Sequence, residues 1–255
     1  MTILWIILAI ILGIPFLLFL IFLIEPAIIS LVFSWFLSLF VKNPPYVSME
    51  EEFPEGKLLK ENWKTIRAEL DQVLEHVEDI PRFHEVDKLQ RFISAKDDIA
   101  WRTFIIKGYD VWLDENAAQV PKTSELIRQL PRVNLAMFSI IDGGKHIPPH
   151  YGFFKSILRY HLGLMIPEGE VFIEVSGERY YWKEGEDVLF DDTYRHQVWN
   201  RSDGRRVVLF LNVMRKKGLS PFMQKVNSAV FAILRCSKKL QQAAKNAEVA
   251  RPVED

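Results

Sequence analysis

The segment Val171–Phe190 reads VFIEVSGERYYWKEGEDVLF and packs three short β-prone runs into one stretch. The runs are Val171–Val175, Arg179–Trp182 and Asp187–Phe190, and the turn residues Ser176-Gly177 lie between the first two. Short strands separated by glycine turns are typical of antiparallel sandwiches and barrels, which are built from hairpins. This segment therefore predicts an antiparallel β fold.

The same pattern continues on both sides of this segment. Further β-prone runs are Val133–Ile141, Arg159–Ile166, Gln197–Trp199 and Arg206–Val213. We expect a β-sandwich or barrel core from about residue 133 to residue 218.

Helical periodicity flanks the predicted core. An apolar face recurs through Lys57–Val77, and Thr123-Ser124-Glu125 is expected to start a second helix that Pro131 ends. The tail, residues 219–255, has an amphipathic stripe from Pro221 onward. This stripe is compatible with a membrane-surface helix or with a helix packed on its own domain.

Residues 1–42 form an apolar block that we predict to be a membrane anchor. Ile3–Ile24 has no charged side chain, and such a helix reaches about 33 Å, enough to span a bilayer. Glu25-Pro26 interrupts the block before a shorter run, Ala27–Val41. Either a helical hairpin or one span followed by an interfacial helix would fit, and small residues such as Ser34 favour the hairpin.

Composition narrows the classes of partner and compartment. The net charge of -1 argues against nucleic acid, because phosphate binding needs a basic surface. Cys236 is the single cysteine, so no intrachain disulfide can form.

His150 and His196 lie at the edges of predicted strands, where a barrel can bring distant positions together. Two imidazoles with open positions suit Fe(II), although a histidine by itself more often has another role. Arg159 and His161 share one strand face, and Arg206 opens the last run. A buried arginine needs an anion, either a carboxylate such as Asp191, Asp192 or Glu174, or a dicarboxylate co-substrate.

Four motifs together resemble the aspartyl/asparaginyl β-hydroxylase family. They are His150-Tyr151-Gly152, Arg159-Tyr160-His161-Leu162-Gly163-Leu164, Glu184-Gly185 and Phe190-Asp191-Asp192-Thr193-Tyr194-Arg195-His196-Gln197-Val198-Trp199-Asn200. The resemblance covers roughly Val133 to Arg215. It implies a mainly β protein with a double-stranded β-helix, or jelly-roll, core. It also implies Fe(II) as cofactor, with 2-oxoglutarate and O2 as co-substrates.

The resemblance also implies roles for individual residues. His150 and His196 match the two iron ligands, and Gly152 stands where most 2-oxoglutarate oxygenases have a carboxylate ligand. Arg206 and Ser139 match residues that hold the distal carboxylate of 2-oxoglutarate. Arg159 and His161 match residues that hold the rest of it. We expect Asp191 and Asp192 to be supporting residues, and Trp182 to be a core aromatic.

The anchor makes the chain most similar to bacterial lipid A acyl-chain 2-hydroxylases. We therefore expect hydroxylation at C2 of a secondary acyl chain of lipid A, with the catalytic domain on the cytoplasmic face of the bacterial inner membrane. Alternatives are an ornithine-lipid hydroxylase, a peptidyl-aspartate/asparagine β-hydroxylase, or a metal-free jelly-roll that binds lipid without turnover.

Overall fold

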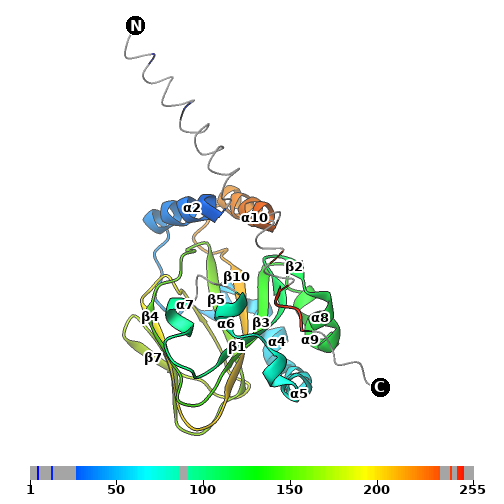
Figure 1. The fold of residues 1–255 in the computed structure, drawn as a ribbon. Helices are drawn as coiled ribbons and strands as arrows, with labels where there is room; N and C mark the ends of the chain where they lie inside the picture. Colours follow the sequence, from blue (N-terminus) through cyan, green and yellow to red (C-terminus); the bar gives the residue numbers. More distant parts are fainter. Residues whose placement is uncertain are drawn as a thin grey trace.

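Two antiparallel sheets carry the fold, shown in Figure 1. The computed structural model describes residues 27–86, 91–235 and 246–249, with single residues 5, 13 and 242. The larger sheet has the strand order β2-β1-β3-β10-β5-β8 and the smaller one β4-β9-β6-β7. The strands are β1 (Trp101–Gly108), β2 (Val111–Trp112), β3 (Val133–Ile141), β4 (His146–His150), β5 (Ile157–Met165), β6 (Glu170–Val175), β7 (Glu178–Tyr181), β8 (Asp187–Phe190), β9 (His196–Arg201) and β10 (Arg206–Met214).

The Ser176-Gly177 turn closes the β6–β7 hairpin as the sequence predicts. Val175 pairs with Glu178, so the loop has two residues, with φ of 54° at Ser176 and 87° at Gly177. Positive φ at both loop positions is the geometry whose twist matches that of paired strands. This hairpin fixes the register of β6 against β7.

The large sheet is buried on both faces, which explains its long apolar runs. One face packs against the helices through residues such as Phe138, Tyr160 and Leu209. The other faces the small sheet, where Ile141, Val188 and Val208 contact its inward-pointing side chains. The space between the two sheets is where the predicted site residues converge.

Helices surround the sheets, and their bounds refine the expectations. They are α2 (Ala27–Phe40), α3 (Met49–Glu52), α4 (Lys57–Glu61), α5 (Trp63–Leu74), α6 (Phe83–Val86), α7 (Arg91–Ser94), α8 (Asp114–Gln119), α9 (Pro121–Arg128) and α10 (Pro221–Arg235), with short 3₁₀ turns at Pro54–Gly56 and Val77–Asp79. The single helix expected over Lys57–Val77 is wrong in detail. It breaks at Asn62, whose side-chain amide donates to the carbonyl of Leu58. The helix expected from Thr123 begins earlier, with Pro121 in its first turn.

Strands β1, β2 and β4 were not predicted, and β1 lies inside the large sheet ahead of residue 133. Trp101–Gly108 is buried at nearly every position, so it lacks the alternation that marks a half-exposed strand. Strand β4 contains Pro148-Pro149, which argue against a strand except at an edge. It is indeed the edge strand of the small sheet.

Helices α2 and α10 lie side by side at one end of the sandwich (Figure 1). Leu37 of α2 and Val41, just after this helix, pack with Leu219, and Phe231 of α10 packs with Ile157. The described part of α10 thus packs on its own domain. Within the described ranges, no helix combines the length and apolarity needed to cross a membrane. The predicted span Ile3–Ile24 lies almost wholly outside these ranges.

Candidate active site

The two histidines that sequence analysis singled out meet between the sheets. His150 ends β4 and His196 begins β9, and they are direct partners in the strand register. Their ring centroids are 4.1 Å apart. Residues 46 positions apart in the chain therefore face one small volume, as a shared metal ion would require.

Both imidazoles are held in the same tautomer by the backbone. Nδ1 of His150 lies 2.8 Å from the carbonyl oxygen of Pro148, and Nδ1 of His196 lies 2.9 Å from that of Tyr194. A carbonyl only accepts, so this geometry assigns the ring proton to Nδ1 in each case. Each Nε2 keeps its lone pair, as a metal-ligating histidine needs.

Burial keeps both rings neutral. Desolvation, followed by repulsion from His196, lowers the pKa of His150 to about 4, and desolvation also lowers the pKa of His196. Neutral imidazole is the form that binds metal, so protons do not compete for these rings near pH 7.

The space beside Gly152 is taken by another part of the chain. A Cβ at Gly152 would overlap the carboxyl group of Asp192, and the Gly152 amide donates to the Asp192 carbonyl at 2.7 Å. The Asp192 carboxylate is buried and accepts from Nε of Arg159 at 2.6 Å, while its Oδ1 has no partner. Over the ranges that the structure describes, no three His, Cys, Asp or Glu side chains are grouped to hold a metal. The donor set in view is the two imidazoles, with a buried carboxylate nearby.

Arg206 and His161 form a second buried polar group in the same interior. Arg206 is 1% exposed, makes one long bond of 3.4 Å to the carbonyl of Ser139, and leaves its Nε without a partner. Both ring nitrogens of His161 are also unpaired. Burial lowers the pKa of Arg206 to about 9, and burial followed by repulsion from Arg206 lowers that of His161.

None of the carboxylates suggested by composition pairs with Arg206 in the described part of the chain. Asp192 binds Arg159, Glu174 binds Arg179, and Asp191 binds Lys155 and Arg215. Arg206 therefore faces the interior as a buried donor without an anion. Such an orphan is costly unless a ligand supplies the acceptor, so these residues fit a carboxylate co-substrate.

Two polar partners in this interior were missed by the sequence reasoning. Nε1 of Trp101 donates to Oγ of Ser139 at 3.1 Å, which leaves the Ser139 hydroxyl hydrogen free to donate. Arg159 is bound on a second side by the side-chain oxygen of Asn212. Neither Trp101 nor Asn212 belongs to the quoted motifs, and only the strand register shows their role.

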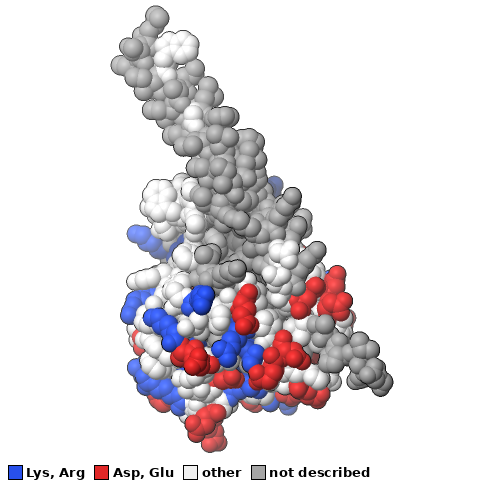
Figure 2. Space-filling view, in the orientation of Figure 1, with Lys and Arg blue, Asp and Glu red and all other residues white. Residues whose placement is uncertain are grey.

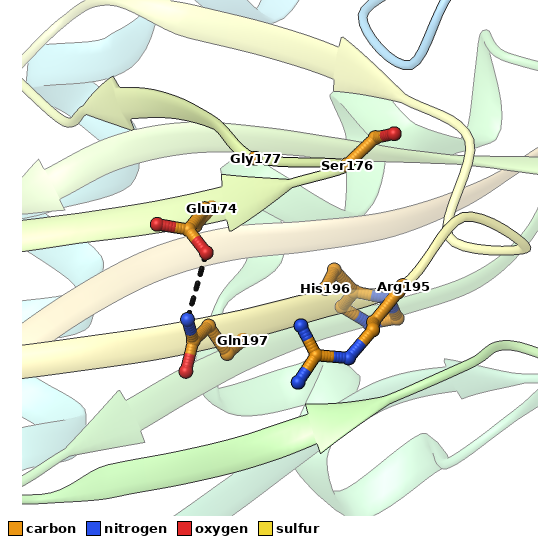
Figure 3. Close-up of a pocket in the computed structure, with 6 residues that line it drawn as sticks. All are labelled: Glu174, Ser176, Gly177, Arg195, His196 and Gln197. Atoms are coloured by element: carbon orange, nitrogen blue, oxygen red, sulfur yellow. Dashed lines mark hydrogen bonds between the residues drawn. The ribbon is translucent and has the colours of Figure 1, made fainter.

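Figure 3 shows a small pocket lined by residues of β6, β9 and the adjoining turns, with His196 among them. Gln197 donates to Glu174 at 2.8 Å, and the two residues are register partners on β9 and β6. Because successive strand residues face opposite ways, Gln197 points away from the face that carries the His196 ring. His196 also lines the pocket, so this residue borders both the pocket and the space that it shares with His150.

Comparison with known proteins identifies a family for the chain. The family model described as aspartyl/asparaginyl beta-hydroxylase matches residues 60–216, more than half of the chain. The chain belongs to this family. It is 37% identical over 175 residues to an ornithine lipid ester-linked acyl 2-hydroxylase of Rhizobium tropici, covering 68% of this chain and 61% of that one. It is 32% identical over 167 residues to the human aspartyl/asparaginyl beta-hydroxylase, covering 62% of this chain and 20% of that one.

These matches reach less than two thirds of the length of either relative. Among solved structures, a cupin 2 conserved barrel domain protein from Salinispora arenicola overlaps 51% of this chain and 83% of its own. The identity is 14% and the TM-score 0.30. A TM-score this low supports no conclusion about the fold, so the fold assignment rests on the observed strand order.

Proposed function

We propose that the protein is an Fe(II)- and 2-oxoglutarate-dependent dioxygenase that hydroxylates an acyl chain of a membrane lipid. The observation that carries this proposal is the pairing of two neutral imidazoles, half-buried His150 and buried His196, each with Nε2 free, next to a buried arginine without an anion. Phe190 contacts both the His161 and His196 rings, so the two polar groups share one interior. Membership of a hydroxylase family supports the same reaction class.

Each site residue has its own role in the proposed reaction. Bound iron and 2-oxoglutarate would supply the oxidising power, so that one oxygen atom of O2 enters a C–H bond and the other enters succinate as CO2 leaves. His150 and His196 would hold the metal. Arg206 and Ser139 would hold the distal carboxylate, where a guanidinium offers paired donors. His161, together with the part of the Arg159 guanidinium that does not bind Asp192 or Asn212, would orient the rest of the co-substrate. The apolar side chains around the site would exclude water.

The relatives favour a lipid substrate over a peptide. The Rhizobium protein acts on an ornithine lipid acyl chain, and its match is longer and more identical than that of the human hydroxylase. We therefore propose C2 of a lipid acyl chain as the position hydroxylated. The Rhizobium relative supports ornithine lipid as the substrate. Lipid A as the substrate is supported only by the resemblance found in the sequence.

The surface supports a location at a bilayer. The outer side of α2 exposes six large apolar side chains, which are Leu31, Val32, Trp35, Phe36, Leu39 and Phe40. Tyr151 and Phe153, directly after His150, are 60% and 54% exposed. Lys155 in the same loop donates its amide to Ser34 of α2 at 2.6 Å, so this loop adjoins the helix. Because Fe(II) and 2-oxoglutarate are cytosolic, we propose that the domain lies on the cytoplasmic face of the inner membrane.

Lipid mass spectrometry tests the proposal. Cells that express the full chain should contain ornithine lipid, or lipid A, heavier by one oxygen atom on an ester-linked acyl chain. His150→Ala and His196→Ala should each abolish this product, because either change leaves one imidazole for the metal. Trp199→Phe, on the outer sheet face beside His146, is a matched control that should keep it.

The remaining outcomes separate the alternatives. A peptidyl hydroxylase would leave both lipids unmodified while converting 2-oxoglutarate to succinate in the presence of a peptide. A lipid-binding protein without catalysis would give no succinate with any membrane extract. Product formation by both histidine variants would contradict the assignment of the metal ligands.

A further inference from the structure

Trp182 carries a buried N–H group that has no acceptor. The residue follows β7, is 3% exposed, and its Nε1 has no hydrogen-bond partner. An indole nitrogen only donates, and buried tryptophans normally find an acceptor for it. The sequence suggested a plain core aromatic, so the unpaired donor is a feature that packing alone does not explain.

The surroundings of Trp182 are rich in donors. The guanidinium carbon of Arg206 lies 4.5 Å from the indole ring centroid, and the His161 ring stacks on the indole with centroids 5.8 Å apart. Nε of Arg206 and both His161 ring nitrogens are unpaired as well. Three neighbouring buried side chains thus have unpaired nitrogens, and this local deficit of acceptors matches an anion rich in oxygen.

We propose that the Trp182 indole N–H donates a hydrogen bond to the distal carboxylate of 2-oxoglutarate, alongside Arg206. This inference rests on the proposed function. The distal carboxylate is chosen because Trp182 contacts Arg206, the residue proposed to hold that end. Trp182 is then a co-substrate-binding residue, and it helps the site to prefer a dicarboxylate over a simple 2-oxo acid.

Indole NMR tests the hydrogen bond directly on the unmodified protein. The full chain, in detergent micelles, loaded with Zn(II) and labelled with ¹⁵N in its tryptophans, gives one Nε1–H signal per indole. Trp182→Phe identifies the signal of Trp182 by its loss. Adding 2-oxoglutarate should move this signal downfield, whereas the Trp199 signal on the outer sheet face should stay in place.

Calorimetry with the Mn(II)-loaded protein tests the energetic consequence. Trp182→Phe keeps an aromatic ring and loses the N–H, so it should weaken 2-oxoglutarate binding about tenfold or more. Binding of 2-oxopentanoate, which has no distal carboxylate, should change little. Trp199→Phe is the control and should leave both affinities unchanged.

The outcomes distinguish this inference from the proposed function. If the wild-type chain binds 2-oxoglutarate but the indole signal does not move and Trp182→Phe binds as tightly, the Trp182 assignment is overturned while the enzyme class stands. Equal weakening for both 2-oxo acids would also overturn it, because that pattern reports general packing. A wild-type chain that does not bind 2-oxoglutarate would overturn the proposed function itself.

Discussion

At the scale of single residues, Gly152 shows how sequence and structure give different accounts of one position. The sequence has no carboxylate there, where related oxygenases place a metal ligand. In the structure the Asp192 carboxylate, held by Arg159, occupies the space that a side chain at Gly152 would need. Glycine is required at 152 because Asp192 and any larger residue cannot share that volume.

We predict that Gly152→Ala destabilises the protein by about 2 kcal/mol, because the methyl group pushes Asp192 away from Arg159. The cost should shrink by at least about 1 kcal/mol on an Asp192→Ala background, where the clashing carboxyl is absent. Urea unfolding of the four proteins of this cycle in micelles measures the coupling. Equal costs in both backgrounds would show that the two residues do not compete for space.

Individual residues also show how much of the candidate site could be predicted from the sequence. The two histidines and Arg206 were named from the sequence, since strand ends and charged residues in apolar runs are visible there, but the sequence left open whether a protein carboxylate pairs with Arg206. Trp101 and Asn212 were not, because their roles depend on which strands are neighbours. Strand order is a long-range property that local pattern does not encode.

At the scale of elements, the turn between β8 and β9 is held by a buried charge cluster. Asp191 is fully buried and binds Nζ of Lys155 at 2.6 Å and Nη2 of Arg215 at 2.7 Å. Burial by itself would raise the pKa of Asp191, but Arg215 and Lys155 together lower it below its ordinary value. This cluster ties the turn before His196 to the loop after His150.

We predict that Asp191→Asn destabilises the protein by about 3–5 kcal/mol at pH 7, because two cations lose their buried partner. The folded-state pKa is lowered, so the stabilisation is present above the ordinary value of 3.8 and is lost as pH falls through the lower folded value. The stability difference between wild type and variant, measured by urea unfolding, should therefore begin to shrink as pH falls below 3.8. Asp203→Asn, an exposed control, should stay within about 0.5 kcal/mol.

A constant difference between wild type and Asp191→Asn from pH 7 to pH 3 would contradict this account. It would mean that the Asp191 side chain acts through its shape and hydrogen bonds rather than through its charge.

At the scale of the whole molecule, charge and apolar surface are segregated. Figure 2 shows Lys, Arg, Asp and Glu interspersed mostly over the sandwich body, with some Lys and Arg also beside the end that carries α2. The described surface of α2 is apolar on its outer side as well as its inner side. A helix that is apolar all round is normally buried, so an apolar medium is the partner expected to cover it.

We predict that Phe153→Ser lowers turnover of a lipid embedded in vesicles by about tenfold, because one exposed aromatic ring beside His150 no longer enters the bilayer. Turnover of a short-chain lipid dispersed in detergent should be unchanged. Phe92→Ser is a control with similar exposure, 57%, on α7, which lies against the sandwich body (Figure 1). Equal loss on both substrates would show a defect in the site rather than in membrane docking.

The sequence by itself determined the antiparallel β core, its tight Ser176-Gly177 hairpin and the apolar N-terminal block. Those features follow from local chemistry: side-chain alternation, glycine turns and runs without charge. The six candidate site residues were predicted from the sequence through resemblance to a known family. Only the tertiary structure decided that β1 joins the large sheet and that Asp192 fills the space at Gly152. It also decided that Trp182 and Arg206 lie in contact, each buried with an unpaired donor. These are contacts between segments distant in the chain, and their energies exist only once strand order and register have brought the segments together.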